Sequence, residues 1–141
     1  MEKKQIEIQL ITTWPADEIV QLYKAGGWWK DTYDTAGIPQ LITGSFAFAV
    51  AVDPNTGKSV GMGRVISDGV SDAYIQDLVV LPSLRGQNIG KKIAQKLIDF
   101  CLSKGIVWIG LIAEPGSSAF YTSLGFKTMD QHIPMRYTME K

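Results

Sequence analysis

The sequence predicts an α+β fold, in which helices flank one mixed β-sheet. Two patterns carry this prediction. The segments 46–52 and 60–67 are strand-like and are joined by the turn sequence D-P-N-T-G-K, which is typical of an antiparallel hairpin. A strand at 74–81, an amphipathic helix at 89–104 and a wholly apolar strand at 107–112 follow. This order favours a parallel strand pair joined by a crossover helix.

The elements before the hairpin follow from periodicity and capping. Apolar residues alternate with polar ones over 6–10, which predicts a half-buried first strand. Pro15 suits an early helical position, and the helix that it begins is expected to end at Gly26 and Gly27. Residues 30–40 then predict a loop or a short helix.

The elements after the crossover complete the fold. A short helix is expected over 117–124, and Gly125 is the residue that ends it. Residues 128–139 predict one or two closing strands, with a bend around His132. For this lone histidine we favour a role in the turn over a catalytic one.

Composition is that of an ordinary globular domain and argues against several classes of function. With 141 residues, 45% of them hydrophobic, the sequence predicts a single domain over residues 1–141. Its 14 Lys and Arg balance 14 Asp and Glu, which argues against a surface that coats nucleic acid. The single cysteine, Cys101, excludes an internal disulfide and fits a reducing compartment. The first residues hold no apolar signal core, and no stretch approaches the ~18 apolar residues of a membrane span. We therefore expect a cytoplasmic protein without membrane contact.

A strand that runs into a glycine-containing loop and then into a helix is a candidate anion site. Pro82 ends the strand because it has no N–H to donate, and the next helix opens near Asn88. Unpaired N–H groups converge at a helix N-terminus, and Arg85, Lys91 and Lys92 add cationic side chains beside them. The pattern indicates a phosphate-bearing ligand. Neither of the two familiar phosphate loops, G-x-x-x-x-G-K-S/T and G-x-G-x-x-G, is present.

Two motifs resemble those of a known family. Arg85–Gly90, R-G-Q-N-I-G after V-V-L-P, resembles the acyl-CoA pyrophosphate loop Q/R-x-x-G-x-G/A of the GCN5-related N-acetyltransferases (GNAT). Phe120–Phe126, F-Y-T-S-L-G-F, resembles the F/L-Y-x-x-L-G-F segment of the same family. Asn88 stands where the family usually has Gly. Two readings of it stay open: a backbone with positive φ, which Asn tolerates best after Gly, and a side-chain N-cap.

The resemblance covers essentially the whole chain and implies a GNAT-like fold. This fold has a mixed, mostly antiparallel central sheet with a splayed parallel strand pair, flanked by helices. Acetyl-CoA is the implied cosubstrate, its pantetheine arm lies between the splayed strands, and no metal is implied. Glu114 replaces an Asn that many members have after the second parallel strand, so that CoA contact is not carried over. The cofactor-binding residues carried over by position are Leu78, Val79, Val80, Arg85, Gly86, Gln87, Asn88, Ile89, Gly90, Lys91 and Phe120.

The implied activity is transfer of an acetyl group from acetyl-CoA to a primary amine, by direct attack in a ternary complex. The acceptor class is a small amine, a lysine or an N-terminal amine. This chemistry needs a donor to the oxyanion and a proton for the departing thiolate. By resemblance, the amide of Val79 donates to the thioester carbonyl and Tyr121 is the general acid. The alternative interpretation, which does not use the resemblance, is that Tyr121 is a phenol packed under its helix.

The sequence supplies no strong general base. Relatives with a Glu or His base on this strand carry it at positions that fall here on Tyr74 and Gln76, neither of which is a good base. Asp77 is the only carboxylate inside the strand, but strand parity places it on the opposite face, and we interpret it as structural. We therefore expect deprotonation through ordered water, with Tyr74, Gln76 and Asp77 as candidates to position it, or an amine that arrives neutral.

The acceptor side is predicted at three aromatic residues, Trp28, Trp29 and Tyr33, where the family places variable loops. They either line an acceptor pocket, where aromatic faces attract an ammonium group, or pack into the core. Arg64, in mid-strand, is interpreted as a partnered structural cation rather than a substrate ligand. The expected partners are amine acceptors, small molecules or peptides, and the resemblance allows a homodimer. The alternative function is a non-catalytic CoA-binding sensor or interaction module.

Overall fold

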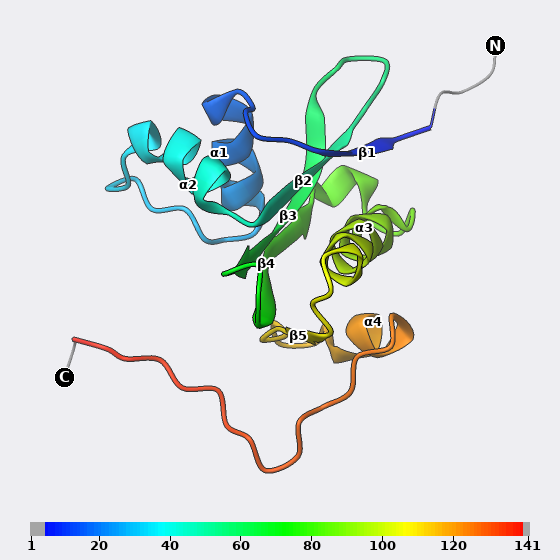
Figure 1. Cartoon of the computed structure of the whole chain (residues 1–141). Helices are drawn as coiled ribbons and strands as arrows, with labels where there is room; N and C mark the ends of the chain where they lie inside the picture. The colour runs from blue at the N-terminus through cyan, green and yellow to red at the C-terminus, as the bar shows by residue number, and fades with distance from the viewer. Residues whose placement is uncertain (1–4, 140–141) are drawn as a thin grey trace. The chain divides into compact units, whose positions relative to one another are not determined.

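The structure, a computed structural model, describes residues 5–139. The predicted first strand, first helix, hairpin, crossover helix and last short helix are all present, each close to its expected bounds. In chain order the elements (Figure 1) are β1 (Glu7–Leu10), α1 (Ala16–Ala25), η1 (Thr35–Gly37), α2 (Ile38–Gly44), β2 (Ala47–Val52), β3 (Ser59–Ser67), β4 (Asp72–Val80), η2 (Pro82–Leu84), α3 (Ile89–Ser103), β5 (Trp108–Gly110) and α4 (Ser118–Ser123).

The strands form one mixed sheet in the order β1-β2-β3-β4-β5. Neighbouring strands are antiparallel except β4 and β5, which are parallel. The predicted α+β fold, with its hairpin and its parallel pair, is therefore confirmed. β5 is shorter than expected, because it pairs with β4 only from Asp72↔Trp108 to Tyr74↔Gly110. β4 continues along β3 to Val80, so beyond Tyr74 its other edge has no strand partner among the described residues.

Helices cover both faces of this sheet, with α1 and α2 on one face and α3 on the other (Figure 1). The core on the α1 face joins the two helices to β2, β3 and β4 through Ile19, Val20, Leu22, Tyr23, Ile38, Ile42, Phe48, Val50, Val52, Met62 and Val79. On the α3 face, a Cβ atom at Gly63 would lie 3.1 Å from the side chains of Ile93 and Leu97. The absence of that side chain lets α3 pack closely against β3.

A β-bulge interrupts the pairing of β3 with β4. The register shifts between two adjoining pairs, Arg64↔Gln76 and Met62↔Val79. Asp77 and Leu78 therefore oppose a single residue of β3, and Asp77 adopts a φ of 59°. This left-handed conformation is uncommon for a residue with a side chain, and Asp is among those that tolerate it best.

The bulge overturns the predicted facing of Asp77. Counting along a regular strand placed its side chain on the face opposite to that of Gln76. In the structure the carboxylate accepts hydrogen bonds from Tyr23 of α1 and Arg64 of β3, and Arg64 also donates to Gln76. Asp77 and Gln76 thus share the α1 face. The prediction is wrong because the extra residue resets the alternation of side chains.

The chain divides into two compact units, and the boundary falls between Leu111 and Ile112. The first unit holds the whole sheet with α1, α2 and α3, and the second holds α4. Two such units can belong to one domain, so the single domain over residues 1–141 stays a prediction.

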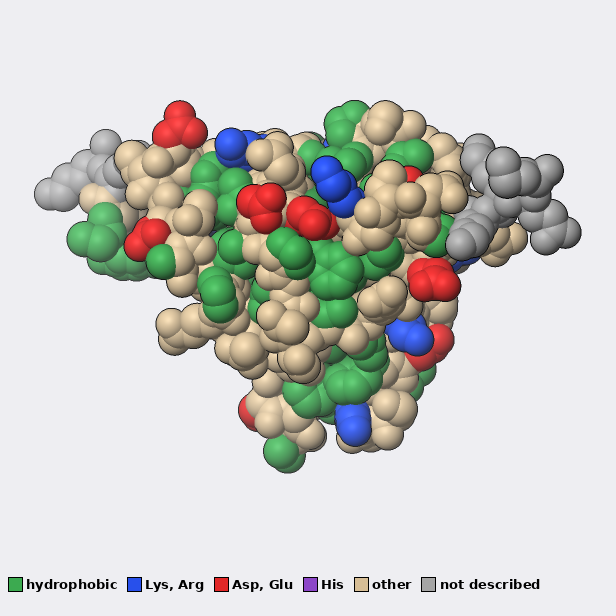
Figure 2. Space-filling model, turned by 90° about the horizontal axis from the view of Figure 1, so that it is seen from above, with side chains coloured by type: hydrophobic (Ala, Val, Ile, Leu, Met, Phe, Trp, Pro, Cys, Tyr) green, Lys and Arg blue, Asp and Glu red, His purple; other side chains and the backbone are tan. Residues whose placement is uncertain are grey.

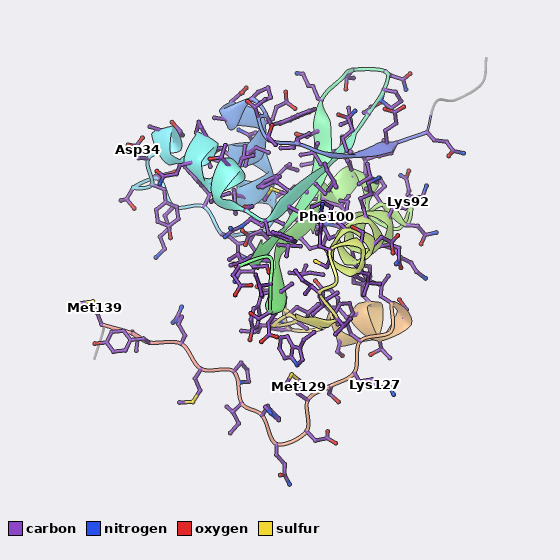
Figure 3. All side chains as sticks on the ribbon, in the orientation of Figure 1. Asp34, Lys92, Phe100, Lys127, Met129 and Met139 are labelled. Atoms are coloured by element: carbon purple, nitrogen blue, oxygen red, sulfur yellow. The ribbon has the colours of Figure 1, made fainter. Side chains whose placement is uncertain are left out.

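The closing strands predicted over residues 128–139 are not formed. That segment has neither helix nor strand, as Figure 3 shows around Met129 and Met139. Apolar residues alternate along it, but a strand also needs a neighbour for its backbone groups, and the sheet contains no strand from this segment. Ile133 and Tyr137 are accordingly 79% and 89% exposed.

Surface charge is mixed in sign. On the face seen in Figure 2, Lys and Arg side chains lie among Asp, Glu and hydrophobic side chains, so neither sign dominates that face. This distribution agrees with the net charge of zero. Within residues 5–139, no helix has the length and apolar character that crossing a bilayer requires.

Candidate active site

The loop after β4 has the backbone of an anion site. The η2 turn starts at Pro82, and α3 begins at Ile89. Gly86 and Asn88 both have positive φ, at 83° and 64°. The side chain of Asn88 makes no capping hydrogen bond, so the positive backbone angle is the reading that the structure supports. The first N–H groups of α3 have no intrahelical acceptor, and such groups bind anions at helix N-termini.

Cationic side chains flank this loop. The guanidinium of Arg85 donates from Nε to the carbonyl of Val80 (2.9 Å) and from Nη2 to the carbonyl of Ala25 (3.4 Å). Arg85 therefore ties the loop to the end of β4 and to the end of α1. Lys91 and Lys92 are exposed in the first turn of α3, where Figure 3 labels Lys92.

Strand register decides which amides of β4 face its open edge. Two neighbouring positions of the β3–β4 ladder fix it: the N–H of Leu81 donates to the carbonyl of Val60 at 2.9 Å, and Met62 pairs with Val79. Because backbone groups alternate sides along a strand, Val79 faces β3, and its neighbours Leu78 and Val80 face outward. The carbonyl of Val80 accordingly accepts its hydrogen bond from Arg85 and not from β3. The amide of Val79, which the resemblance implies as the donor to the thioester carbonyl, therefore faces β3 and not the open edge.

Tyr74 and Gln76 lie on the α1 face of β4, and both are exposed. The ring of Tyr74 lies 5.4 Å from that of Trp108, which folds over Gly110 on β5. The Oε1 atom of Gln76 accepts a hydrogen bond from Nη2 of Arg64 at 3.3 Å. A phenol and an amide thus lie at the surface beside the open edge, and neither is a strong base.

Asp77 is engaged on the same face. Its Oδ2 atom accepts from the phenol of Tyr23 at 2.7 Å and from Nε of Arg64 at 2.6 Å. Burial, and then the negative charge of Asp77, raise the pKa of Tyr23 far above its ordinary value, so Tyr23 remains a donor. The interpretation of Arg64 as a partnered cation agrees with this ion pair.

The predicted acceptor residues form one aromatic group around Tyr23. Its ring lies 6.3 Å from the rings of both Trp28 and Trp29, and Trp29 lies 5.4 Å from Tyr33. Both tryptophans are half-buried against the α1-face core, and Tyr33 is 48% exposed. Each tryptophan therefore packs on the core and keeps part of its surface free, so the two predicted alternatives are not exclusive.

Tyr121 lies on α4 in the second unit. Its ring is held between those of Phe120 and Phe126, at centroid distances of 5.0 and 5.9 Å. Burial, and then the charge of Glu114, raise the pKa of the Tyr121 phenol above its ordinary value. Because its pKa is raised, the Tyr121 phenol is protonated near neutral pH, as a general acid must be.

Gly125 follows α4 with a φ of 103°, which agrees with its predicted role in ending that helix.

Other reactive side chains fall outside this site. Cys101 is fully buried on α3, and burial raises the pKa of its thiol, as expected of a packed residue that is not a nucleophile. His132 is exposed in a turn, with Nδ1 2.8 Å from the carbonyl oxygen of Asp130. Within residues 5–139, no cluster of three or more His, Cys, Asp or Glu side chains could hold a metal ion.

Sequence reasoning missed two contributors on the α1 face. Tyr23 lies on the apolar side of α1, yet its hydroxyl donates a hydrogen bond to Asp77. Trp108 was assigned to a wholly apolar strand, yet it is 39% exposed beside Tyr74. A tyrosine on an apolar stripe often directs its hydroxyl to a buried partner, which is the signal that marks Tyr23.

Comparison with known proteins identifies the family. The model of the acetyltransferase (GNAT) family matches residues 12–126. The chain therefore belongs to the GNAT acetyltransferase family.

Its relatives include plant enzymes. The chain is 37% identical over 93 residues to GCN5-related N-acetyltransferase 1, chloroplastic, of Arabidopsis thaliana, which covers 66% of this chain and 47% of that protein. It is 38% identical over 72 residues to serotonin N-acetyltransferase 2, chloroplastic, of Oryza sativa subsp. japonica, which covers 51% of this chain and 36% of that protein. The chain thus spans less than half the length of these relatives.

Solved structures confirm the predicted fold. A GNAT-family acetyltransferase of Streptococcus pneumoniae superposes with a TM-score of 0.79 at 26% identity, over 96% of this chain and 100% of the other. Glucosamine-6-phosphate N-acetyltransferase of Arabidopsis thaliana superposes with a TM-score of 0.77 at 18% identity, over 97% and 100%. At this low identity, the second likeness shows the fold alone.

Proposed function

We propose that the protein transfers the acetyl group of acetyl-CoA to a primary amine by direct attack in a ternary complex. One observation carries the proposal: β4 loses its partner beyond Tyr74, and the loop that follows leads straight into the free N–H groups of α3. An open strand edge beside a helix N-terminus suits an extended amide-containing arm that ends in a pyrophosphate. Family membership supports the same assignment.

The cofactor would be held mainly by backbone groups. The outward amides of Leu78 and Val80 suit the acyl and pantetheine portions, and the amides of residues 86–91 suit the pyrophosphate. Exposed Lys91 adds a positive charge beside the pyrophosphate. Arg85 occupies the carbonyl of Val80, so it must release that carbonyl if a pantetheine amide is to pair with it. A structural neighbour, AAC(6')-Iy, is bound to the bisubstrate analogue CoA-S-monomethyl-acetylneamine, which supports a CoA ligand for this fold.

In the proposed reaction, a backbone amide stabilises the oxyanion and the phenol of Tyr121 supplies the proton. The amine nitrogen attacks the thioester carbon, the carbon–sulfur bond breaks, and the outward amide of Leu78 donates to the oxyanion. Tyr121 gives its proton to the departing thiolate, which its raised pKa permits. The amine loses its proton through ordered water at Tyr74 and Gln76, or arrives neutral.

The acceptor is a compact amine: a small molecule, a single lysine or an N-terminal amine. The aromatic group of Trp28, Trp29 and Tyr33 supports this class, because aromatic faces attract ammonium groups and fit apolar stems. Relatives named serotonin N-acetyltransferase 2 and histone acetyltransferase TAP1 have acceptors of both kinds. A cytoplasmic location and a homodimer remain further proposals from the sequence.

One observation favours the alternative function, a CoA-binding sensor. The carboxylate of Asp77, in the middle of β4, is engaged by both Arg64 and Tyr23 and is not free to take a proton from the amine. The two functions differ in turnover. Calorimetric titration with acetyl-CoA, followed by thiol-release assays with a panel of amines, separates them. Binding with amine-dependent thiol release supports the transferase. Binding without release from any amine supports the sensor, and absence of binding contradicts both.

A further inference from the structure

Three separate elements meet at the carboxylate of Asp77. Its Oδ2 atom accepts from the phenol of Tyr23 on α1 at 2.7 Å and from Nε of Arg64 on β3 at 2.6 Å. Arg64 donates further to Oγ of Ser45 at 3.4 Å and to Oε1 of Gln76 at 3.3 Å. We call Tyr23, Arg64 and Asp77 the Asp77 clamp, because they tie α1 and β3 to the bulge in β4.

The clamp is a poor catalytic group in its own right. The charge of Arg64 offsets that of Asp77, and the carboxylate directs its hydrogen bonds to the other two members of the clamp. Tyr23 keeps its proton, because burial and then the charge of Asp77 raise its pKa. Any effect of the clamp on the site therefore comes from how it positions the backbone of β4, and not from its charge.

The bulge decides which amides of β4 reach the open edge. After the extra residue Asp77, Leu78 and Val80 face outward while Val79 faces β3. If β4 lost the bulge, the residues after it would shift by one position against β3. The amide of Val79 would then face the open edge, and those of Leu78 and Val80 would face β3. A residue with a side chain at a φ of 59° is held there by its surroundings, and the clamp bonds supply that hold.

We propose that the Asp77 clamp positions the acyl site: by holding the bulge, it fixes the outward N–H groups of Leu78 and Val80 where the thioester binds. Its three members are positioning residues, which act through the backbone of β4. This inference rests on acetyl transfer as the proposed function and adds how the chain aligns the acyl carbonyl.

The chain carries a matched control at the other end of α1. The carboxylate of Glu18 accepts from Nε1 of Trp14 at 3.1 Å, and from the backbone N–H and the hydroxyl of Ser59 at 2.7 and 3.0 Å. Like the clamp, Glu18 ties α1 to β3, but its hydrogen bonds reach neither the bulge nor β4. Glu18→Gln should therefore cost stability without moving the outward amides.

Three variants of the full chain separate positioning from stability. Tyr23→Phe removes one donor and keeps the ring. Asp77→Ala removes the carboxylate and leaves a side chain that is strained at positive φ, so nothing holds the bulge, and Glu18→Gln is the control. Their Tm, their Kd for acetyl-CoA and their kcat for a verified amine are measured. In both clamp variants kcat should fall roughly 10- to 100-fold with Kd unchanged within about threefold, because misplaced groups slow the chemical step. Glu18→Gln should keep the wild-type kcat at a comparable loss of Tm.

A second readout needs no turnover. Acetyl-CoA and CoA differ only in the acetyl group, so amide chemical shifts that differ between the two complexes report where that group binds. The difference should centre on Leu78 in the wild type and in Glu18→Gln. It should shrink or move in Tyr23→Phe and Asp77→Ala.

The two proposals fail in different ways. A wild-type chain that binds no acetyl-CoA overturns the proposed function. A wild-type chain that binds and transfers, while the clamp variants match Glu18→Gln in kcat and amide shifts, overturns this inference alone. If Asp77→Ala does not fold, Tyr23→Phe still decides, because it removes a single oxygen atom.

Discussion

Tyr121 is the residue on which the proposed chemistry depends most. α4 holds its phenol between the rings of Phe120 and Phe126. Burial, and then the charge of Glu114, raise its pKa, so the proton stays on the phenol until a thiolate can take it. The proposed role of this phenol as the general acid is tested directly by substitution.

Tyr121→Phe should lower kcat by roughly 10²–10⁴, the usual scale of general acid catalysis. The Kd of acetyl-CoA should change little, because the ring and its packing remain. Steady-state kinetics with a verified amine, together with calorimetry, measure both quantities. Wild-type turnover in this variant would exclude Tyr121 as the acid.

The pH dependence of kcat has a sign fixed by the same pKa. Tyr121 acts in its protonated form, and its pKa lies above the ordinary value of 10.0, so the midpoint of the alkaline loss of activity should lie above pH 10. Because the charge of Glu114 raises that pKa, Glu114→Gln should move the alkaline limb to lower pH. A pH–kcat profile of both proteins measures the shift. A limb that stays in place, or moves to higher pH, would contradict the assignment.

Two residues with left-handed backbone show how far sequence reasoning reaches at this scale. Asn88 stands where the family has Gly, and this substitution led to the open prediction of positive φ that the structure shows. Asp77 also has positive φ, but the segment Q-D-L-V-V is that of a continuous strand. Nothing in it marks an extra residue. Regular alternation then assigned the carboxylate to the wrong face.

At the scale of elements, the loop between β4 and α3 is the part whose backbone matters most. Gly86 has a φ of 83° with open space where a Cβ atom would lie, so a side chain there would meet strain but no clash. Gly57, in the turn between β2 and β3, has a φ of 72° and equally open surroundings. The two glycines are matched in strain and differ only in place.

Gly86→Ala and Gly57→Ala should each lose about 1–2 kcal/mol of stability, the cost of a left-handed residue with a side chain. Only Gly86→Ala should also weaken CoA binding, by about tenfold, because relaxation of the loop turns its amides away from the pyrophosphate. Thermal unfolding and calorimetric titration give the two numbers. Equal CoA affinity in both folded variants would place the pyrophosphate elsewhere.

The segment after α1 carries the acceptor prediction. Trp29→Ala should raise the acceptor KM about 2- to 30-fold, which corresponds to a cation–π contact of ~0.5–2 kcal/mol. The Kd of acetyl-CoA should not change. Trp14→Ala is the control, because Trp14 packs on the same core but contacts Glu18 instead of the aromatic group. Acceptor kinetics that respond equally to both substitutions would indicate a loss of stability and not of a pocket wall.

At the scale of the molecule, the antiparallel hairpin and the parallel pair followed from hydrophobic periodicity and turn chemistry, and the structure confirms both. The structure of the last segment could not be predicted in this way. Residues 128–139 carry the alternation of a strand, but pairing depends on a distant neighbour that local sequence does not specify. The length of β5 could not be predicted for the same reason. The apolar run 107–112 does not show at which residue β5 and β4 stop pairing.

The early end of β5 has a consequence for hydrogen exchange. Along β4, protection should alternate between neighbouring residues: slow at Val79, whose amide is in the ladder with β3, and fast at Leu78 and Val80. Acetyl-CoA should slow exchange at the two fast positions and leave the slow one unchanged, in the absence of any acceptor. Uniform protection before ligand is added would contradict the register. In this picture the cosubstrate takes the place of a sixth strand, and the sheet becomes complete only when it is bound.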